Sequence, residues 1–260
     1  VDNGYQRDFD EWPKNHLKDM IIRTTNHPCV IMWSTGNEIP EQKDPNGAKV
    51  ARLLSKVVRT TDPTRPTTSG INLADHAIRN GFTEEIDIVG LNYEAHRYTE
   101  FRRRFPEWVI YGSETESCVS SRDTYYFPVE EEWDRLRDPH HVTSYDVAAP
   151  PWGYAPDVEL EAQRTDSTIL GSYVWTGWDY LGEPTPYKTE WPSRSSYFGI
   201  VDLAGIPKDR FYIYQAAWRP EPVLHLLPHW TWPGREGEVT PVHCYTNCDS
   251  VELFVNGRSH

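Results

Sequence analysis

Two glutamates in this sequence end segments that have the pattern of buried strands. Glu38 ends "HPCVIMWSTGNE", residues 27–38, and Glu114 ends "WVIYGSE", residues 108–114. Short apolar runs bounded by turn residues or polar residues are typical of strands buried on both faces. Two opposed carboxyl groups suit glycoside hydrolysis, in which one donates a proton and the other attacks the anomeric carbon or activates water. The elements that carry the two glutamates therefore decide whether they can act together.

Predicted strands and helices alternate over most of the chain. The strands are expected at residues 29–33, 67–72, 86–93, 108–114 and 169–180, and the helices at 11–25, 46–63, 98–105, 157–165 and 211–218. Alternation without hairpin signals predicts parallel strands joined by helical crossovers. Five strands fit either an open doubly wound sheet or part of a (β/α)8 barrel. No glycine-rich phosphate loop follows a strand, which disfavours a nucleotide-binding open sheet.

The ends of these strands carry the residues of interest. In a parallel α/β barrel the carboxyl ends of all strands meet at one face, so Glu38 and Glu114 are expected to face each other across one pocket. A retaining enzyme holds its two carboxyl groups about 5–5.5 Å apart. A single glutamate at a strand end more often caps a helix or pairs with arginine, but the Asn, Tyr and Trp at the neighbouring strand ends all suit a sugar. Glu116 is a rival to Glu114, because period 2 places both on the same side of a strand.

Composition narrows the classes of partner. The 260 residues carry a net charge of −13, which argues against nucleic acid, and no apolar run reaches the about 20 residues of a membrane helix. Eleven Trp and 15 Tyr are many for a core alone, and flat rings with polar edges suit sugar faces. The four cysteines are too few for a disulfide scaffold; Cys29 is expected in the core, and the spacing of Cys244 and Cys248 does not indicate a zinc site.

The pattern changes near residue 220. Short, partly alternating apolar runs follow, separated by "PGREGE" and "NCDS", and these are typical of the start of an all-β sandwich. We therefore expect residues 1–219 to form the α/β part and residues 220–260 to open a second domain. Both ends of the chain lack the features of a complete protein, so an internal fragment is expected.

Four motifs, in order, resemble glycoside hydrolase family 2. "HPCVIMWSTGNE" resembles its acid/base strand, "WVIYGSETES" its nucleophile strand and "VWTGWDYLGEPTPY" its last barrel strand in the β-galactosidase-like form. The segment from "HLLPHW" to "LFVNG" is similar to the immunoglobulin-like domain that follows the barrel. The resemblance implies about strands 4–8 of a (β/α)8 TIM barrel, a partial one, followed by a truncated immunoglobulin-like sandwich.

The resemblance also implies roles for the residues at the strand ends. Glu38 would be the general acid/base and Glu114 the nucleophile of a double displacement. Asn37 matches the family residue that binds the sugar 2-hydroxyl, and Tyr93 would donate a hydrogen bond to Glu114. Trp175 would be the platform under the sugar ring.

Two residues near the last predicted strand have roles that the sequence leaves open. Asp179 and Glu183 either contact sugar hydroxyls or bind only the backbone of "GEPTP". Asn92 is assigned a structural role.

The sugar is predicted from the absence of a motif that binds glucuronate. Family β-glucuronidases carry an Asn-x-Lys motif after the last barrel strand, where this chain has Ser196-Tyr197-Phe198. A β-galactoside is therefore favoured over a β-glucuronide or β-mannoside. A carbohydrate-binding protein without catalysis is the alternative from another class, and it would need aromatic rings but not two opposed carboxylates.

No cofactor is required by this interpretation. Family β-galactosidases often hold Mg²⁺ through ligands on an earlier strand, outside this fragment, so a requirement for Mg²⁺ in the parent protein stays open. The expected partner is an oligosaccharide or other glycoside. The sequence does not reveal the oligomeric state or the localisation, and a periplasmic or secreted protein is compatible with it.

Overall fold

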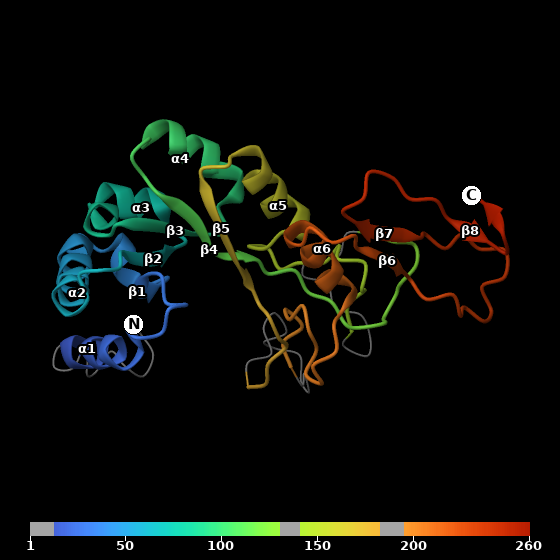
Figure 1. Ribbon diagram of the computed structural model, residues 1–260, viewed down its shortest axis with the longest axis horizontal. Coiled ribbons are helices and arrows are strands. Elements are labelled where there is room, and N and C mark those ends of the chain that lie inside the picture. Colours follow the sequence, from blue (N-terminus) through green and yellow to red (C-terminus); the bar gives the residue numbers. More distant parts are fainter. Residues whose placement is uncertain (1–12, 131–140, 183–194) are drawn as a thin grey trace. The chain divides into compact units, whose positions relative to one another are not determined.

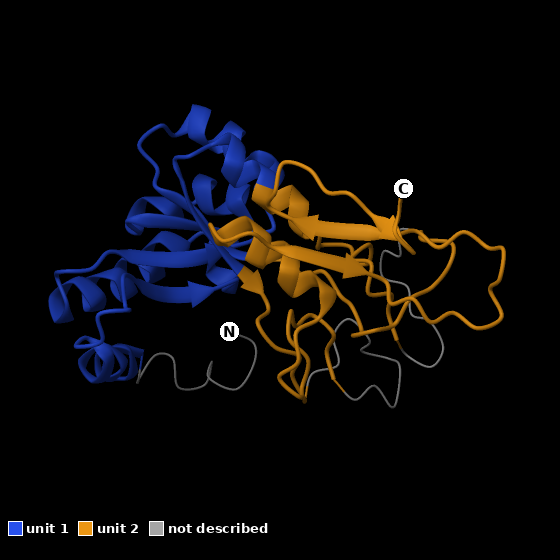
Figure 2. Cartoon of the chain, turned by 45° about the vertical axis from the view of Figure 1, so that its right-hand side comes forward, with its two compact units in different colours: residues 1–115, 161–173 blue, residues 116–160, 174–260 orange. Residues whose placement is uncertain are grey.

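The computed structural model describes residues 13–130, 141–182 and 195–260. The chain divides into two compact units, which are residues 1–115 with 161–173 and residues 116–160 with 174–260 (Figure 2). A five-stranded sheet has the order β1-β2-β3-β4-β5, and the pairs β1–β2, β2–β3 and β3–β4 are parallel. Its strands are β1 (Trp33–Asn37), β2 (Thr67–Ile71), β3 (Ile88–Asn92), β4 (Ile110–Glu116) and β5 (Ile169–Trp175).

Helices alternate with these strands along the chain, as predicted (Figure 1). The α-helices up to β5 are α1 (Pro13–Thr24), α2 (Gly47–Thr61), α3 (Ala74–Arg79), α4 (Tyr98–Arg104) and α5 (Pro156–Thr165). Single 3-10 turns are η2 (Pro40–Lys43), η3 (Phe82–Glu85) and η4 (Ala95–Arg97). Helix α2 is amphipathic and buries Ala51, Leu54 and Val58 on one face.

A small core joins α1, β1 and α2 in the first unit. Ile21, Trp33 and Val58 pack together, each at most 4% exposed. The Trp33 indole donates a hydrogen bond of 3.0 Å to Asp62, which also pairs with Arg65 at 2.6 Å. This contact anchors the start of β1 to the turn that precedes β2.

The predicted first strand, residues 29–33, is wrong for all but its last residue. Strand β1 begins at Trp33, Cys29 is exposed rather than in the core, and the side chain of Ile31 is 63% exposed. The strand consists mostly of small and polar residues that have little intrinsic strand preference. They are extended because they pair with β2, for example Asn37 opposite Gly70.

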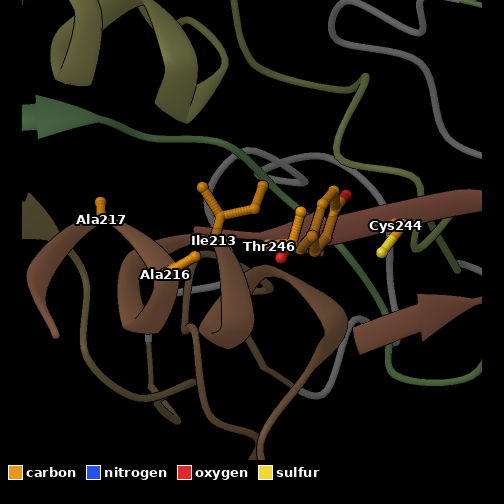
Figure 3. Close-up of a pocket in the computed structure, with 6 residues that line it drawn as sticks. Ile213, Ala216, Ala217, Cys244 and Thr246 are labelled. Atoms are coloured by element: carbon orange, nitrogen blue, oxygen red, sulfur yellow. The ribbon is translucent and has the colours of Figure 1, made fainter. Parts of the chain in front are cut away.

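The second unit contains the C-terminal β segments. Helix α6 (Asp209–Trp218) is followed by the antiparallel pair β6 (Leu224–Leu227) and β7 (His243–Thr246), and then by β8 (Phe254–Val255) and β9 (Arg258–Ser259). A cavity of about 280 Å³ lies between α6 and β7 and is lined by Ile213, Ala216, Ala217, Cys244, Tyr245 and Thr246 (Figure 3). The domain boundary at residue 220 stays a prediction.

Candidate active site

The first unit brings Glu38, Tyr93 and Glu114 to neighbouring strand ends. Glu38 follows β1, and its amide donates to the Gly70 carbonyl of β2 at 2.9 Å. Tyr93 follows β3, and its amide donates to the Glu114 carbonyl of β4 at 3.0 Å. Glu38 and Tyr93 have φ of 49° and 60°. Residues other than glycine rarely adopt this left-handed backbone conformation. Strained backbone of this kind is concentrated at functional sites.

Irregular strand pairing sets the direction of the side chains. The register between β3 and β4 shifts after Leu91, so that Asn92 lies opposite Glu114 and Ser113 is the extra residue. The register between β1 and β2 shifts before Asn37. Bulges of this kind redirect a side chain beside an active site. Here they allow Ser113 and Glu114, which are adjacent in sequence, both to contact Asn92.

Two asparagines link the two glutamates. Asn92 Nδ2 lies 2.9 Å from Glu38 Oε1, 2.9 Å from Asn37 Oδ1 and 3.4 Å from Glu114 Oε2. Asn37 Nδ2 donates to the same Glu114 oxygen at 2.9 Å. Tyr93 Oη donates to Glu114 Oε1 at 2.7 Å. The two carboxyl groups therefore belong to one hydrogen-bond network, in which Glu114 has several neutral donors.

Glycines in β2 and β3 leave room for this network. A Cβ on Gly70 would lie far inside contact distance of Asn37 Oδ1 and 3.0 Å from Asn92 Oδ1. A Cβ on Gly90, which pairs with Gly70, would lie 2.7 Å from Ser113 Cβ and Oγ. Both positions therefore require glycine, because any larger residue would collide with the side chains of Asn37, Asn92 or Ser113.

The surroundings of Glu38 shift the pKa of its carboxyl group. Burial raises the pKa of Glu38 above its ordinary value, the hydrogen bond from Asn92 opposes this rise, and the neighbouring charge of Glu114 adds to it. A raised pKa keeps a carboxylic acid protonated nearer to neutral pH, which is what a general acid needs.

Comparison with known proteins places this arrangement in a family. Residues 5–116 match the family model described as "Glycosyl hydrolases family 2, TIM barrel domain". A β-galactosidase of Bacteroides ovatus is 38% identical over 99% of this chain. The chain belongs to glycoside hydrolase family 2. The five-stranded parallel sheet is accordingly part of a TIM barrel, followed by a β domain.

Other proteins similar to this chain are named for different activities. A solved β-glycosidase from Bacteroides vulgatus matches 98% of the chain with a TM-score of 0.81 and 31% identity. A β-glucuronidase of Bacteroides fragilis is 25% identical over the whole chain. Residues 237–260 match a domain of unknown function. The chain spans about a third of these relatives, with 34% of the B. ovatus protein, 34% of the B. vulgatus structure and 37% of the B. fragilis protein covered.

The rival Glu116 occupies a different environment from Glu114. Its side chain is completely buried, and the residue has a φ of 65°. Glu114 is only partly buried and takes its hydrogen bonds from site residues. The two glutamates therefore differ in exposure, and Glu114 contacts Asn37 and Tyr93.

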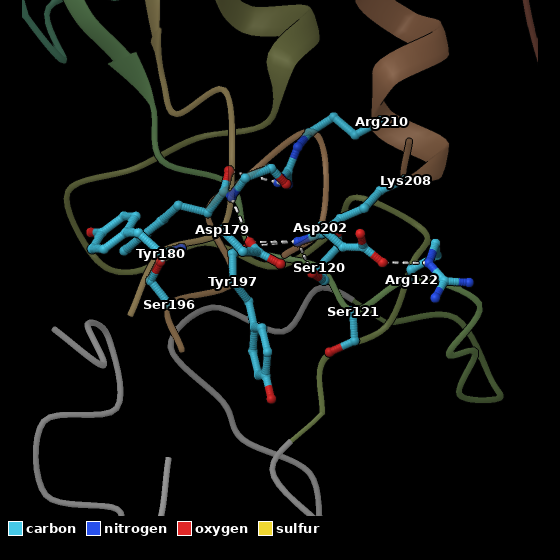
Figure 4. Close-up of polar contacts among 12 residues, drawn as sticks. Ser120, Ser121, Arg122, Asp179, Tyr180, Ser196, Tyr197, Asp202, Lys208 and Arg210 are labelled. Atoms are coloured by element: carbon cyan, nitrogen blue, oxygen red, sulfur yellow. Dashed lines mark hydrogen bonds and ion pairs between the residues drawn. The ribbon is translucent and has the colours of Figure 1, made fainter. Parts of the chain in front are cut away.

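Residues predicted after β5 belong to the second unit. Trp175 ends β5 and packs against a cluster of Val119, Val142, Ala148 and Phe198. Asp179 is buried and accepts hydrogen bonds from the Gly199 amide at 2.9 Å and from Lys208 Nζ at 2.8 Å (Figure 4). Lys208 also donates to the Ser120 carbonyl at 2.7 Å.

The structure therefore shows Asp179 bound to backbone and to a lysine, and its contact with a sugar stays a prediction. Glu183 lies outside the described residues.

Asn92 has more contacts with the site than the sequence indicates, and Ser113 and Gly70 were not predicted to take part in it. Asn92 was assigned a structural role, whereas the structure places its amide against both glutamates. A glycine inside a strand often marks a close approach of other groups, so Gly70 could have been found from the sequence. The bulge at Ser113 has no sequence signal that we recognise.

Residues 13–130, 141–182 and 195–260 hold no group of three or more His, Cys, Asp or Glu arranged to bind a metal ion. Over the same residues, no helix has the length and apolar character needed to cross a membrane.

Proposed function

We propose that the whole protein is a retaining glycosidase in which Glu38 is the general acid/base and Glu114 the nucleophile. The observation that carries this proposal is the shared Asn92 amide, at 2.9 Å from one carboxyl oxygen and 3.4 Å from the other. These two oxygens cannot be further apart than the sum of the two distances. Carboxyl oxygens this close support the retaining arrangement, in which the carboxyl groups lie about 5–5.5 Å apart, over the inverting arrangement at roughly 6.5–9.5 Å.

The network supports the first step of a double displacement. The Glu114 carboxylate attacks the anomeric carbon while Glu38 gives its proton to the leaving oxygen, so that the glycosidic bond breaks and a glycosyl ester forms. Donors from Asn37 and Tyr93 orient the attacking carboxylate. In the second step Glu38, now ionised, removes a proton from water, which attacks the same carbon and releases Glu114.

We further propose a β-galactoside as the substrate. The β-galactosidase of B. ovatus shares 38% identity with the chain, whereas a Formosa agariphila protein named "Putative beta-glucuronidase" shares 30%. Ser196 and Phe198, in the segment expected to bind a glucuronate, are buried. Lys208, which contacts the Tyr197 carbonyl, is paired with Asp179. A uronate carboxylate without a cation would be costly to bury.

A substrate comparison tests the proposed specificity. The full-length protein should cleave an aryl β-galactoside with a higher kcat/KM than the matching aryl β-glucuronide. Proton NMR of the first-formed sugar should show the β-anomer, because two inversions retain configuration. A preference for the glucuronide would contradict the substrate. An α-anomer formed first would contradict the mechanism, and sugar binding without turnover would favour the carbohydrate-binding alternative.

Azide rescue tests the two roles. Glu38→Ala should lose most activity on substrates with poor leaving groups but still react with a dinitrophenyl glycoside, which needs little acid help. Azide should then enter the vacated space, restore turnover and yield a β-glycosyl azide. Glu114→Gln should stay inactive with azide, because an amide is a very poor nucleophile. Rescue of Glu114→Ala with an α-glycosyl azide, and not of Glu38→Ala, would reverse the assignment.

A further inference from the structure

Asn92 offers fewer hydrogens than it has acceptors. An amide nitrogen carries two hydrogens, yet Asn92 Nδ2 lies within 3.4 Å of three oxygens, on Asn37, Glu38 and Glu114. Asn92 is only 1% exposed, so these interactions take place away from bulk water. The two carboxyl groups therefore compete for one donor.

The orientation of this amide is fixed from both ends. Ser113 Oγ donates to Asn92 Oδ1 at 2.5 Å. A flipped amide would turn its oxygen toward two carboxyl groups, which is electrostatically unfavourable, and would turn its NH2 toward Ser113. The NH2 group is thus held on the side of Glu38 and Glu114.

The proposed mechanism moves one negative charge between these two carboxyl groups. In the free enzyme Glu114 is ionised and Glu38 protonated. In the glycosyl-enzyme Glu114 is a neutral ester and Glu38 is ionised, because its proton has left with the leaving group. The charge returns to Glu114 when Glu38 takes a proton from the attacking water.

We propose that Asn92 is a positioning residue whose N–H is shared between Glu38 and Glu114 in the free enzyme and serves Glu38 alone in the glycosyl-enzyme, when Glu38 carries the charge. This inference rests on the proposed function. In both the free enzyme and the glycosyl-enzyme, the ionised carboxylate then accepts a hydrogen bond. The change from one state to the other requires only a small movement of the Asn92 N–H group.

The two glutamates depend on Asn92 to different degrees. Glu114 has further donors in Asn37 Nδ2 and Tyr93 Oη, at 2.9 and 2.7 Å. The donor that lowers the pKa of Glu38 is Asn92, and the charged group that raises it is Glu114 from β4. Tyr93, from β3, contacts Glu114, and β2 contributes the Gly70 carbonyl, which accepts from the Glu38 amide. Loss of Asn92 should therefore affect ionised Glu38 most.

The pH dependence of the two steps distinguishes this role from a structural one. With a dinitrophenyl glycoside the second step limits kcat, and its acidic limb reports ionisation of Glu38 in the glycosyl-enzyme. The alkaline limb of kcat/KM for a substrate that needs acid help reports Glu38 in the free enzyme. There Asn92 is shared with ionised Glu114, whereas in the glycosyl-enzyme it serves Glu38 alone.

The experiment uses the full-length protein with Asn92→Leu, which has nearly the same volume and no donor, and Asn92→Ala in case the leucine variant does not fold. The acidic limb of kcat should move up by about one to two pH units, the value of a hydrogen bond to a charged group. The alkaline limb of kcat/KM should move up by less. Ser113→Ala is the control: it keeps the NH2 group and should slow turnover while leaving both limbs nearly in place.

Equal shifts of the acidic limb of kcat and the alkaline limb of kcat/KM in the Asn92 variants would show that Asn92 donates to Glu38 in the same way in both states, which would overturn the inference. Slower turnover with both limbs unmoved would also overturn it. Both results would leave the proposed function intact. Absence of turnover of any aryl β-glycoside by the unmodified protein would overturn the proposed function, and this inference with it.

Discussion

Gly70→Ala tests whether the site depends on the empty space above β2. The backbone at Gly70 does not have the positive φ that alanine resists, so the substitution adds a methyl group without local backbone strain. The methyl would overlap Asn37 Oδ1 and lie 3.0 Å from Asn92 Oδ1. Asn37 must then move, and its hydrogen bonds with Glu114 and Asn92 are lost or lengthened.

The size of the effect follows from this displacement. Restoring ordinary contact moves the Asn37 oxygen by about 1 Å, and a displacement of that size among catalytic groups costs about 100-fold in rate. We therefore expect kcat/KM for an aryl β-galactoside to fall about 100-fold, equivalent to about 2.7 kcal/mol of transition-state stabilisation. The assay is steady-state kinetics on the full-length protein, with circular dichroism to confirm folding.

Lys56→Ala is the control, because Lys56 is an exposed residue of α2 in the same unit and lies outside the site. Its kcat/KM should stay within about twofold of the unmodified protein, as surface substitutions away from special features usually cost little. If folded Gly70→Ala protein keeps kcat/KM within threefold, the packing of Asn37 and Asn92 over Gly70 does not matter for catalysis, and our account of the site is wrong.

Three further predictions concern other contacts. Tyr93→Phe removes the hydrogen bond to Glu114 and should lower kcat/KM about 10- to 100-fold, as measured by steady-state kinetics. The raised pKa of Glu38 should keep the acid protonated to higher pH, so the alkaline limb of kcat/KM for a substrate that needs acid help should lie above 4.5, the ordinary pKa of glutamate. The pH–rate profile for a dinitrophenyl glycoside, which needs little acid help, should lack this limb. Lys208→Met leaves buried Asp179 without its cation and should lower the free energy of unfolding by about 3–5 kcal/mol in denaturant titrations, and adding Asp179→Leu should recover part of it.

The alternation of strand-like and helix-like segments in the sequence was sufficient to predict most strands of the sheet. Strands β2, β3 and β4 lie within or close to the predicted segments, because their apolar residues are buried between helices and neighbouring strands. The first strand was misplaced because residues 34–37 are extended through pairing with β2, which intrinsic preference does not reveal. Helix α3 was missed, since six residues hold too little of a helical pattern to recognise.

The candidate site was predictable only at the level of strand ends. Parallel strands bring their carboxyl ends together, so the neighbourhood of Glu38 and Glu114 follows from element order alone. The contacts of Asn92 do not, because they depend on a bulge at Ser113 and on the direction of individual side chains. The order of strands and helices predicts which strand ends lie together, whereas the contacts between individual atoms depend on local features such as the bulge at Ser113.

Covalent trapping of the nucleophile tests the central claim most directly. A 2-deoxy-2-fluoro-β-galactoside with a dinitrophenyl leaving group should inactivate the full-length protein. The fluorine slows both formation and hydrolysis of the glycosyl-enzyme, and the activated leaving group restores the rate of formation alone, so the intermediate accumulates. Peptide mass mapping should find the sugar on Glu114. Labelling of Glu116 or Glu38, or turnover of active protein without any covalent adduct, would contradict the assignment.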